Sequence, residues 1–268
     1  MLASKIRFET LAPALGAVVH GVDVHSALSE ADGAELNRAL HQYGVLVFES
    51  DRKIDNEAYK AFARTFGEPE IYPFGLNNDA EITPIQPGVP RTDYWHTDGT
   101  PLECPPQAAI LTPVTLPESG GDTMWASMYA AWESLSSPLQ RLLDGLEAFH
   151  TTAAVTRHYD LGQENAFGAG QSHVHPVVLR DPVTDKRMLY VNSNYTARIL
   201  GLRSGESEKI LQLLFEHVNT PEFHFRLRWQ PNMIAVWEER ITQHRALSDY
   251  TGERVLNRIA LAGDRPTS

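Results

Sequence analysis

The front part of the chain alternates between helical and strand-like spacing of its hydrophobic residues. Residues 29–44 (SEADGAELNRALHQYG) follow a Ser start signal and stop at Gly44, which predicts a helix. Residues 55–67 predict a second helix with an Asp/Asn cap and a Gly stop. Residues 16–24 and 44–50 predict strands, the second of them buried. We therefore expect mixed α/β structure here.

From residue 81 onward, short runs of β-branched and aromatic residues dominate the pattern. Turns rich in Gly, Pro and Asp separate many of these runs. Many short strands with such turns indicate a sandwich or a barrel. Two helical inserts are predicted among the strands, at 127–146 and 204–218. The predicted strands are EITPIQ, AAILTPVTL, DTMWAS, HPVVLR, RMLYVN, FHFRLRW, MIAVWE and RVLNRIALAG.

One long segment shows no periodicity. Residues 156–173 (TRHYDLGQENAFGAGQSH) are rich in Gly, Gln and His. A loop of this length inside a compact domain is usually functional or mobile. We therefore expect a lid that orders when a ligand binds.

Composition narrows the classes of protein that the chain can belong to. Lys and Arg number 23 against 34 Asp and Glu, a net charge of −11, which argues against general nucleic-acid binding. The single cysteine, Cys104, allows no intrachain disulfide and fits a cytoplasmic protein. No run approaches 18 apolar residues, so no membrane span is expected. Residues 1–268 are interpreted as one domain.

The candidate chemistry lies with the histidines, but spacing alone does not choose among them. The His-x-Asp pattern occurs at His96 with Asp98 and again at His158 with Asp160, and residues 173–175 form a His-x-His pair. Such short motifs often arise by chance. On a strand, residues i and i+2 face the same side, so His96 and Asp98 would project together after two aromatic residues.

A third ligand would complete a site for a transition metal. Two His and one carboxylate on one face leave three open positions on an octahedral Fe(II). His244 is the best candidate, after a strand that ends at Trp237. Arg254 and Arg258, spaced i and i+4, would lie on one face of a strand whose other positions are apolar. Two such buried arginines need anions.

These residues occur within motifs that resemble a known family. The motifs are WHTD (95–98), LPESGGDT (116–123), YVNSNYTARI (190–199), RWQPNMIAVWEERITQH (228–244) and RVLNRIALAGDRP (254–266). In order and spacing they are similar to the taurine dioxygenase family of Fe(II)/2-oxoglutarate-dependent dioxygenases. The resemblance runs nearly from end to end. It implies a mainly β fold with α inserts, a double-stranded β-helix (jelly roll), preceded by N-terminal α/β elements.

The resemblance also implies roles for individual residues. His96, Asp98 and His244 would bind iron and form the catalytic centre. Thr123 and Arg254 would hold the far carboxylate of 2-oxoglutarate, and Trp237 would line the cosubstrate site. Arg258 would meet the anionic head of the substrate, a sulfonate in taurine-type members.

The substrate positions depart from the taurine pattern. Tyr72 stands where taurine-type members have His, Thr92 where they have Asn, and Tyr195 where they have Phe. Gly99 replaces a bulkier residue directly after the His-x-Asp pair. Gly75, near a Tyr of those members, and Gly99 suggest a roomier pocket.

The resulting expectation is an oxidoreductase that uses Fe(II), 2-oxoglutarate and O2. It would hydroxylate a small anionic molecule, first of all a sulfonate or an alkyl sulfate, and release succinate and CO2. A carboxylate substrate, such as an aryloxyalkanoate or an amino acid, is the alternative. From other classes, a non-catalytic β-barrel binding protein and a zinc hydrolase remain open. Related enzymes suggest a homo-oligomer, either a dimer or a tetramer.

Overall fold

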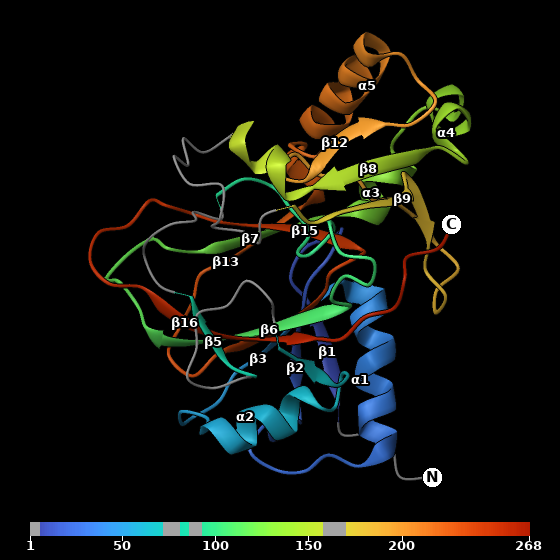
Figure 1. Ribbon diagram of the computed structural model, residues 1–268. Coiled ribbons are helices and arrows are strands. Elements are labelled where there is room, and N and C mark those ends of the chain that lie inside the picture. Colours follow the sequence, from blue (N-terminus) through green and yellow to red (C-terminus); the bar gives the residue numbers. More distant parts are fainter. Residues whose placement is uncertain (1–5, 72–80, 86–92, 158–169) are drawn as a thin grey trace.

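A computed structural model describes residues 6–71, 81–85, 93–157 and 170–268, and it is mainly β with helical inserts (Figure 1). The hydrogen-bonded strands of these residues form four separate sheets rather than one closed barrel. Figure 1 shows α1 and α2 below the largest sheet, on the side away from β7, β13 and β15. The sheets therefore face each other as layers, with helices outside.

The largest sheet has the order β1-β2-β3-β14-β6-β16-β4, and β5 also pairs with β16. Its strand pairs are antiparallel except β2 with β3. The strands are β1 Arg7–Thr10, β2 Ala17–His20, β3 Val45–Phe48, β4 Pro69–Glu70, β5 Thr83–Ile85, β6 Ala108–Thr115, β14 Ile234–Glu238 and β16 Val255–Leu261.

Three smaller sheets and the helices complete the described structure. The smaller sheets are β13 His224–Leu227, β7 Thr123–Ser127 and β15 Thr242–Ala246; β12 Thr196–Ile199, β8 Glu147–Thr151 and β9 Ser172–Pro176; and β10 Val178–Arg180 with β11 Arg187–Leu189. The helices are α1 Glu30–Tyr43, α2 Asn56–Ala63, α3 Met128–Glu133, α4 Ser137–Leu143 and α5 Ser204–His217, with 3-10 turns η1 Thr152–Arg157 and η2 Pro221–Phe223.

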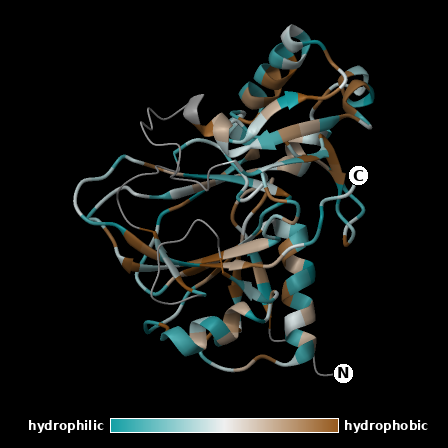
Figure 2. Ribbon diagram, viewed as in Figure 1, coloured by the Kyte–Doolittle hydropathy of each residue, from teal (hydrophilic) through white to brown (hydrophobic). Residues whose placement is uncertain are grey.

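Strand β3 shows how the core is divided. Its alternate residues Leu46 and Phe48 pack into a cluster with helices α1 and α2, whereas Val45 and Val47 pack into a second cluster that contains Trp125 of β7. Successive side chains of a strand point to opposite faces, so a strand covered on both faces is apolar throughout. Figure 2 shows hydrophobic and hydrophilic colours alternating along α1 and α2, as expected of helices with one buried face.

Local signals predicted α1 well and two other helices less well. Ser29 caps α1 by accepting a hydrogen bond from the Asp32 amide, and Gly44 ends it with φ 71°. The second helix ends at Ala63 rather than at Gly67. The single helical insert predicted for 127–146 is wrong, because α3 and α4 are separate helices. Pro138, in the first turn of α4, has no N–H with which to continue α3.

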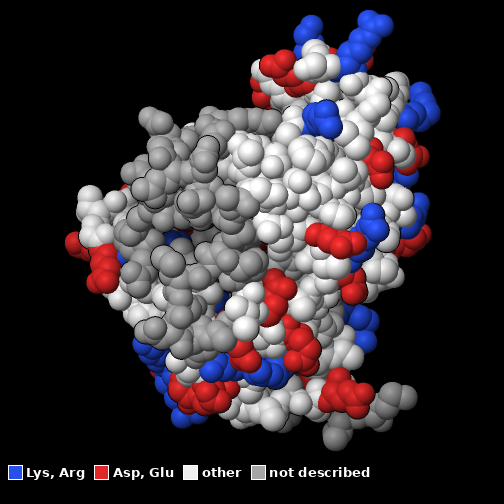
Figure 3. All heavy atoms as spheres, viewed as in Figure 1, with Lys and Arg blue, Asp and Glu red and all other residues white. Residues whose placement is uncertain are grey.

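The outer surface carries both signs of charge. On the face shown in Figure 3, acidic and basic side chains alternate around the edge of the described surface, and the basic ones form no continuous patch there. Within the described ranges, no helix has the length and apolar character needed to cross a membrane.

Candidate metal centre

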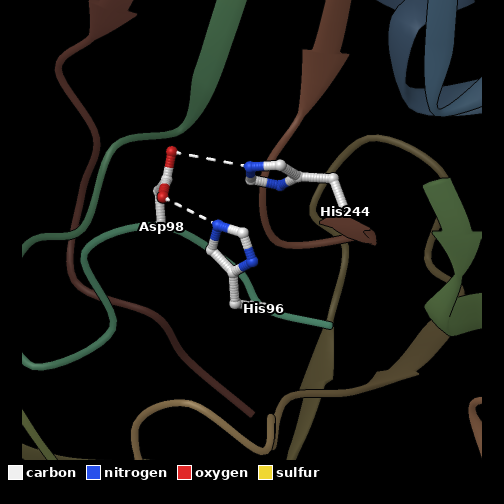
Figure 4. A group of neighbouring side chains, drawn as sticks. All are labelled: His96, Asp98 and His244. Atoms are coloured by element: carbon white, nitrogen blue, oxygen red, sulfur yellow. Dashed lines mark ion pairs between the residues drawn. The ribbon is translucent and has the colours of Figure 1, made fainter. Parts of the chain in front are cut away.

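His96, Asp98 and His244 come together in a buried cluster (Figure 4). Their side chains are turned toward one another, with His96 Nε2 3.5 Å from Asp98 Oδ1 and His244 Nε2 3.8 Å from Asp98 Oδ2. One ligand atom from each residue lies within 4.8 Å of the others. Exposed fractions are 1%, 7% and 8%. Among the described residues, this is the one group of three or more His, Cys, Asp or Glu with such geometry.

Backbone hydrogen bonds place the two histidines opposite each other. His96 donates its amide N–H to His244 O at 3.1 Å, and His244 donates to His96 O at 2.8 Å. His244 lies within β15, where it pairs with Trp125 of β7, rather than after a strand as the sequence predicted. His96 forms an isolated bridge, and Asp98 lies in the turn that follows, so the predicted strand at 96–98 is reduced to one bridge.

The protonation states suit a cation. His96 Nδ1 donates to Tyr94 O at 2.7 Å, which leaves Nε2 as the acceptor that faces Asp98. Burial and the neighbouring His96 hold the pKa of His244 well below its usual value, despite the opposing charge of Asp98. Burial opposes the charge on Asp98 itself, but Arg258 and the two histidines outweigh it and hold the pKa of this carboxyl low. The cluster therefore combines two imidazoles, one of them with a depressed pKa, and one carboxylate.

Arg258 contacts the cluster directly. Its Nη2 lies 2.7 Å from Asp98 Oδ2, and the residue is 5% exposed. From the sequence we expected this buried arginine to need an anion, and the family resemblance implied that the anion is the head group of the substrate. In the structure, Asp98 supplies one such anion.

Arg254 directly precedes β16, the strand that contains Arg258. The pairing register of β16 with β6 shifts just after it, between Val255 and Leu256. Arg254 donates from Nε to Gly121 O at 2.6 Å and from Nη2 to Thr123 Oγ1 at 3.3 Å. Trp229 Nε1 also donates to Thr123 Oγ1, at 2.9 Å. Because this oxygen accepts twice, the Thr123 hydroxyl hydrogen is left to donate elsewhere. Among the residues that the structure describes, Arg254 forms no ion pair although it is 5% exposed.

Trp237 packs against the cluster. Its ring centroid lies 5.0 Å from that of His244 and 5.7 Å from that of Trp125. Its Nε1 donates to Glu239 Oε1 at 2.9 Å. The predicted cosubstrate-lining residue thus adjoins one candidate ligand.

Sequence reasoning missed Glu239. This residue is 0% exposed and follows β14 directly. Burial and the charge of Asp98 raise the pKa of its carboxyl well above the usual range. The doublet Glu238–Glu239 after an apolar strand was a visible signal, because acidic residues are seldom buried without a partner.

Among the described residues, the missing side chain of Gly99 leaves no extra space, because Pro106 fills that position. Gly99 has φ 65°, and a Cβ there would lie 2.6 Å from Pro106 Cδ. The glycine is explained by a left-handed turn packed on proline. Tyr195 is buried in the turn before β12. Tyr72, Thr92 and Gly75 lie outside the described residues, as do His158, Asp160 and most of the predicted lid, namely 158–169.

His173 and His175 belong to another cluster. They share one face of β9, and His173 pairs across the strands with His150 of β8. The ring centroids of His150 and His175 are 5.5 Å apart. Among the described residues, these histidines do not meet the geometric conditions satisfied by His96, Asp98 and His244.

Comparison with known proteins finds relatives that match nearly the whole chain. The model of the taurine catabolism dioxygenase TauD, TfdA family matches residues 7–260. An alpha-ketoglutarate-dependent sulfate ester dioxygenase of Pseudomonas putida is 32% identical, over 98% of this chain and 92% of the relative. A crystal structure of a taurine dioxygenase from Burkholderia xenovorans superposes with TM-score 0.86 and 34% identity, covering 99% and 92% of the two chains. AAD-2, solved in complex with Mn(II) and N-oxalylglycine, superposes with TM-score 0.82 and 26% identity, covering 99% and 100%.

The fold is a mainly β jelly roll, and it holds a buried cluster of two histidines and one carboxylate. Together, this fold and this cluster are typical of non-haem Fe(II) dioxygenases. The chain belongs to the taurine catabolism dioxygenase TauD, TfdA family. It is an oxidoreductase of the alpha-ketoglutarate-dependent dioxygenase class, whose cosubstrates are 2-oxoglutarate and O2. The family and the jelly-roll fold expected from the sequence are confirmed.

Proposed function

We propose that His96, Asp98 and His244 bind one ferrous ion, and that this centre hydroxylates a small organosulfur anion at the expense of 2-oxoglutarate. The observation that carries the proposal is the convergence of the three side chains on one buried point. Two imidazoles and one carboxylate are the ligand set that non-haem Fe(II) oxygenases use. When bound, the ion and 2-oxoglutarate would activate O2 for C–H hydroxylation, releasing succinate and CO2.

For the cosubstrate we propose Arg254, Thr123 and Trp237. Arg254 is buried without an ion pair among the described residues, and a buried guanidinium calls for an anion. The Thr123 hydroxyl hydrogen, left to donate, would add one hydrogen bond to the same carboxylate. Trp237, packed on His244, would exclude water from the oxoacid end.

For the substrate we propose a sulfonate or an alkyl sulfate. Two of the relatives named above are called a sulfate ester dioxygenase and a taurine dioxygenase. Arg258 would orient the anionic head while keeping its contact with Asp98. Hydroxylation of the carbon bonded to sulfonate sulfur or sulfate-ester oxygen gives an unstable product, which collapses to an aldehyde and sulfite or sulfate. We propose Tyr72, Thr92 and Tyr195 as further substrate contacts.

The proposal is tested first with Asp98→Ala. We expect 2-oxoglutarate-dependent oxygen uptake and succinate formation both to vanish, because the carboxylate ligand is lost. An Asp185→Asn variant, on an exposed turn, is the control and should retain both. Undiminished turnover by Asp98→Ala, with a native circular-dichroism spectrum, would contradict the proposed iron site.

The substrate class is tested with a panel of sulfonates, alkyl sulfates and carboxylates, including aryloxyalkanoates and amino acids. Each compound is scored for stimulation of 2-oxoglutarate decarboxylation. We expect an organosulfur anion to stimulate most and to release sulfite or sulfate. Stimulation by a carboxylate alone would replace the substrate class and leave the enzyme class unchanged. The oligomeric state, a dimer or a tetramer, stays a prediction that analytical ultracentrifugation tests. The cytoplasmic location also stays a prediction.

A further inference from the structure

Glu239 is a buried acid that the proposed function does not use. It lies between strands β14 and β15, within the turn that leads to His244. Its side chain has no exposed surface. A buried carboxyl is costly unless its oxygens receive hydrogen bonds, so its partners indicate what it does for the fold.

Both carboxyl oxygens accept hydrogen bonds from residues of the candidate site. Oε1 accepts from Trp237 Nε1 at 2.9 Å, and Oε2 accepts from the backbone N–H of Asp98 at 3.1 Å. Asp98 is 141 residues distant along the chain from Glu239. The carboxyl therefore joins the turn that carries one candidate ligand to the tryptophan that packs on another.

Oε2 of Glu239 also lies near the ring nitrogen of His244 that faces away from Asp98. The distance from His244 Nδ1 to Oε2 is 3.7 Å, beyond a hydrogen bond but within one small rotation of it. Among the described residues, Nδ1 is buried and makes no hydrogen bond. His244 Nε2, the other ring nitrogen, faces Asp98 Oδ2.

We propose that Glu239 is a positioning residue of the metal centre. It holds the Asp98 turn by accepting a hydrogen bond from the backbone N–H of Asp98. It also receives the Nδ1 hydrogen of His244, so that Nε2 of His244 presents its lone pair to the cation. This inference rests on the proposed function, because it assigns a partner to two of the proposed ligands. A hydrogen-bond acceptor that takes the outer N–H of a ligating histidine fixes the ring tautomer and orientation, and removal of such a partner typically lowers metal affinity.

Glutamine at position 239 tests the two hydrogen bonds that the Glu239 oxygens accept. Two N–H groups, from Trp237 and from Asp98, point at the two oxygens of Glu239. Glutamine offers one oxygen and one NH2 group, so one of the two N–H donors would face another donor. The substitution keeps the shape of the side chain, replaces one accepting oxygen by a donating NH2 group and removes the ionisable carboxyl.

The test is the affinity for Mn(II), measured by electron paramagnetic resonance on wild type, Glu239→Gln and Glu239→Ala. We expect the Mn(II) dissociation constant to rise about 10- to 100-fold in both variants, the usual effect of losing an outer partner of a metal ligand. The unfolding temperature without metal is recorded in parallel. A variant that does not fold is replaced by the other one.

Glu238→Gln is the matched control. Glu238 is also buried, but its oxygens accept hydrogen bonds from Arg240 Nε at 2.6 Å and the Ile241 amide at 2.9 Å, and not from the candidate ligands. We expect this variant to unfold at a lower temperature and to keep the Mn(II) dissociation constant of wild type. If Glu239 served only the stability of the fold, both glutamine variants would unfold at a lower temperature and both would keep the Mn(II) dissociation constant of wild type.

Two outcomes separate this inference from the proposed function. If wild type binds Mn(II), Asp98→Ala does not, and folded Glu239→Gln binds as wild type does, the positioning role is wrong and the metal site stands. If wild type and Asp98→Ala bind Mn(II) equally, the proposed metal site itself is wrong.

Discussion

Gly99 shows how one backbone conformation supports the proposed site. It directly follows Asp98, and its φ of 65° lies in the left-handed region that disfavours side chains. Pro106 packs close to it, and a Cβ at this position would approach Pro106 Cδ to 2.6 Å. The glycine thus lets the chain turn sharply and pack closely just after the carboxylate.

Replacement of Gly99 by Ala should destabilise the protein by more than backbone strain alone. The left-handed conformation costs a side chain about 1–2 kcal/mol, and the contact with Pro106 adds about 1–3 kcal/mol of overpacking. Gly201→Ala is the control, because Gly201 has φ 79° but a Cβ there would meet no atom within 4 Å. Urea unfolding measures both free energies. Equal losses in the two variants would show that Pro106 imposes no steric limit.

At the scale of elements, helix α1 depends on its cap. Ser29 Oγ accepts from the Asp32 amide at 3.1 Å. Ser29→Ala should lower the free energy of unfolding by about 1 kcal/mol, the usual worth of such a cap. Ser136, at the start of α4, makes no side-chain cap hydrogen bond, so Ser136→Ala should change stability by less than about 0.5 kcal/mol. Similar losses in the two variants would contradict the role of the cap.

The elements also show what a sequence can reveal. Helix α1 was predictable because its cap, spacing and stop are all local. Strand β15 (TQHRA) was not, because it lacks apolar alternation and is defined by its pairing with β7. The predicted continuous helix at 127–146 failed because short apolar repeats on both sides of Pro138 look alike in sequence.

The site was predictable in the same uneven way. The His96–Asp98 pair is local, and His244 was chosen from its place after a predicted strand before the resemblance implied the same role; the fold brings it beside the pair. The ion pair of Arg258 with Asp98 and the hydrogen bonds of Glu239 join residues far apart in the chain. No spacing rule specifies such contacts, since they depend on how the sheets pack.

At the scale of the whole molecule, buried histidines make the fold sensitive to acid. Burial lowers the pKa of His175 to about 4, and burial together with His175 and His173 holds that of His150 well below the usual value. Below about pH 6.5 these histidines bind protons in the unfolded chain, whereas the buried imidazoles of the folded chain stay unprotonated to lower pH. The free energy of unfolding should therefore fall between pH 6.5 and 4, by about 3 kcal/mol for His175 alone.

Urea unfolding at several pH values checks this expectation. His175→Gln should flatten the slope between pH 6.5 and 4, because it removes the buried imidazole whose pKa is lowered. Burial opposes the charge on Asp181, but hydrogen bonds, among them one from His41, hold the pKa of this carboxyl below its usual value. Asp181 therefore changes the free energy of unfolding only below about pH 4, outside this window. An unchanged slope in His175→Gln would contradict the assignment.

The reciprocal backbone pair between His96 and His244 has a wider consequence. It acts as a clasp made only of main-chain atoms, and it closes a loop that contains most of the molecule. Because the clasp does not depend on any side chain, residues that contact neither Asp98 nor His244 can be exchanged without altering the backbone separation of the two histidines. A protein built in this way can keep one reaction while its choice of substrate drifts, which makes it a suitable scaffold for engineered specificity.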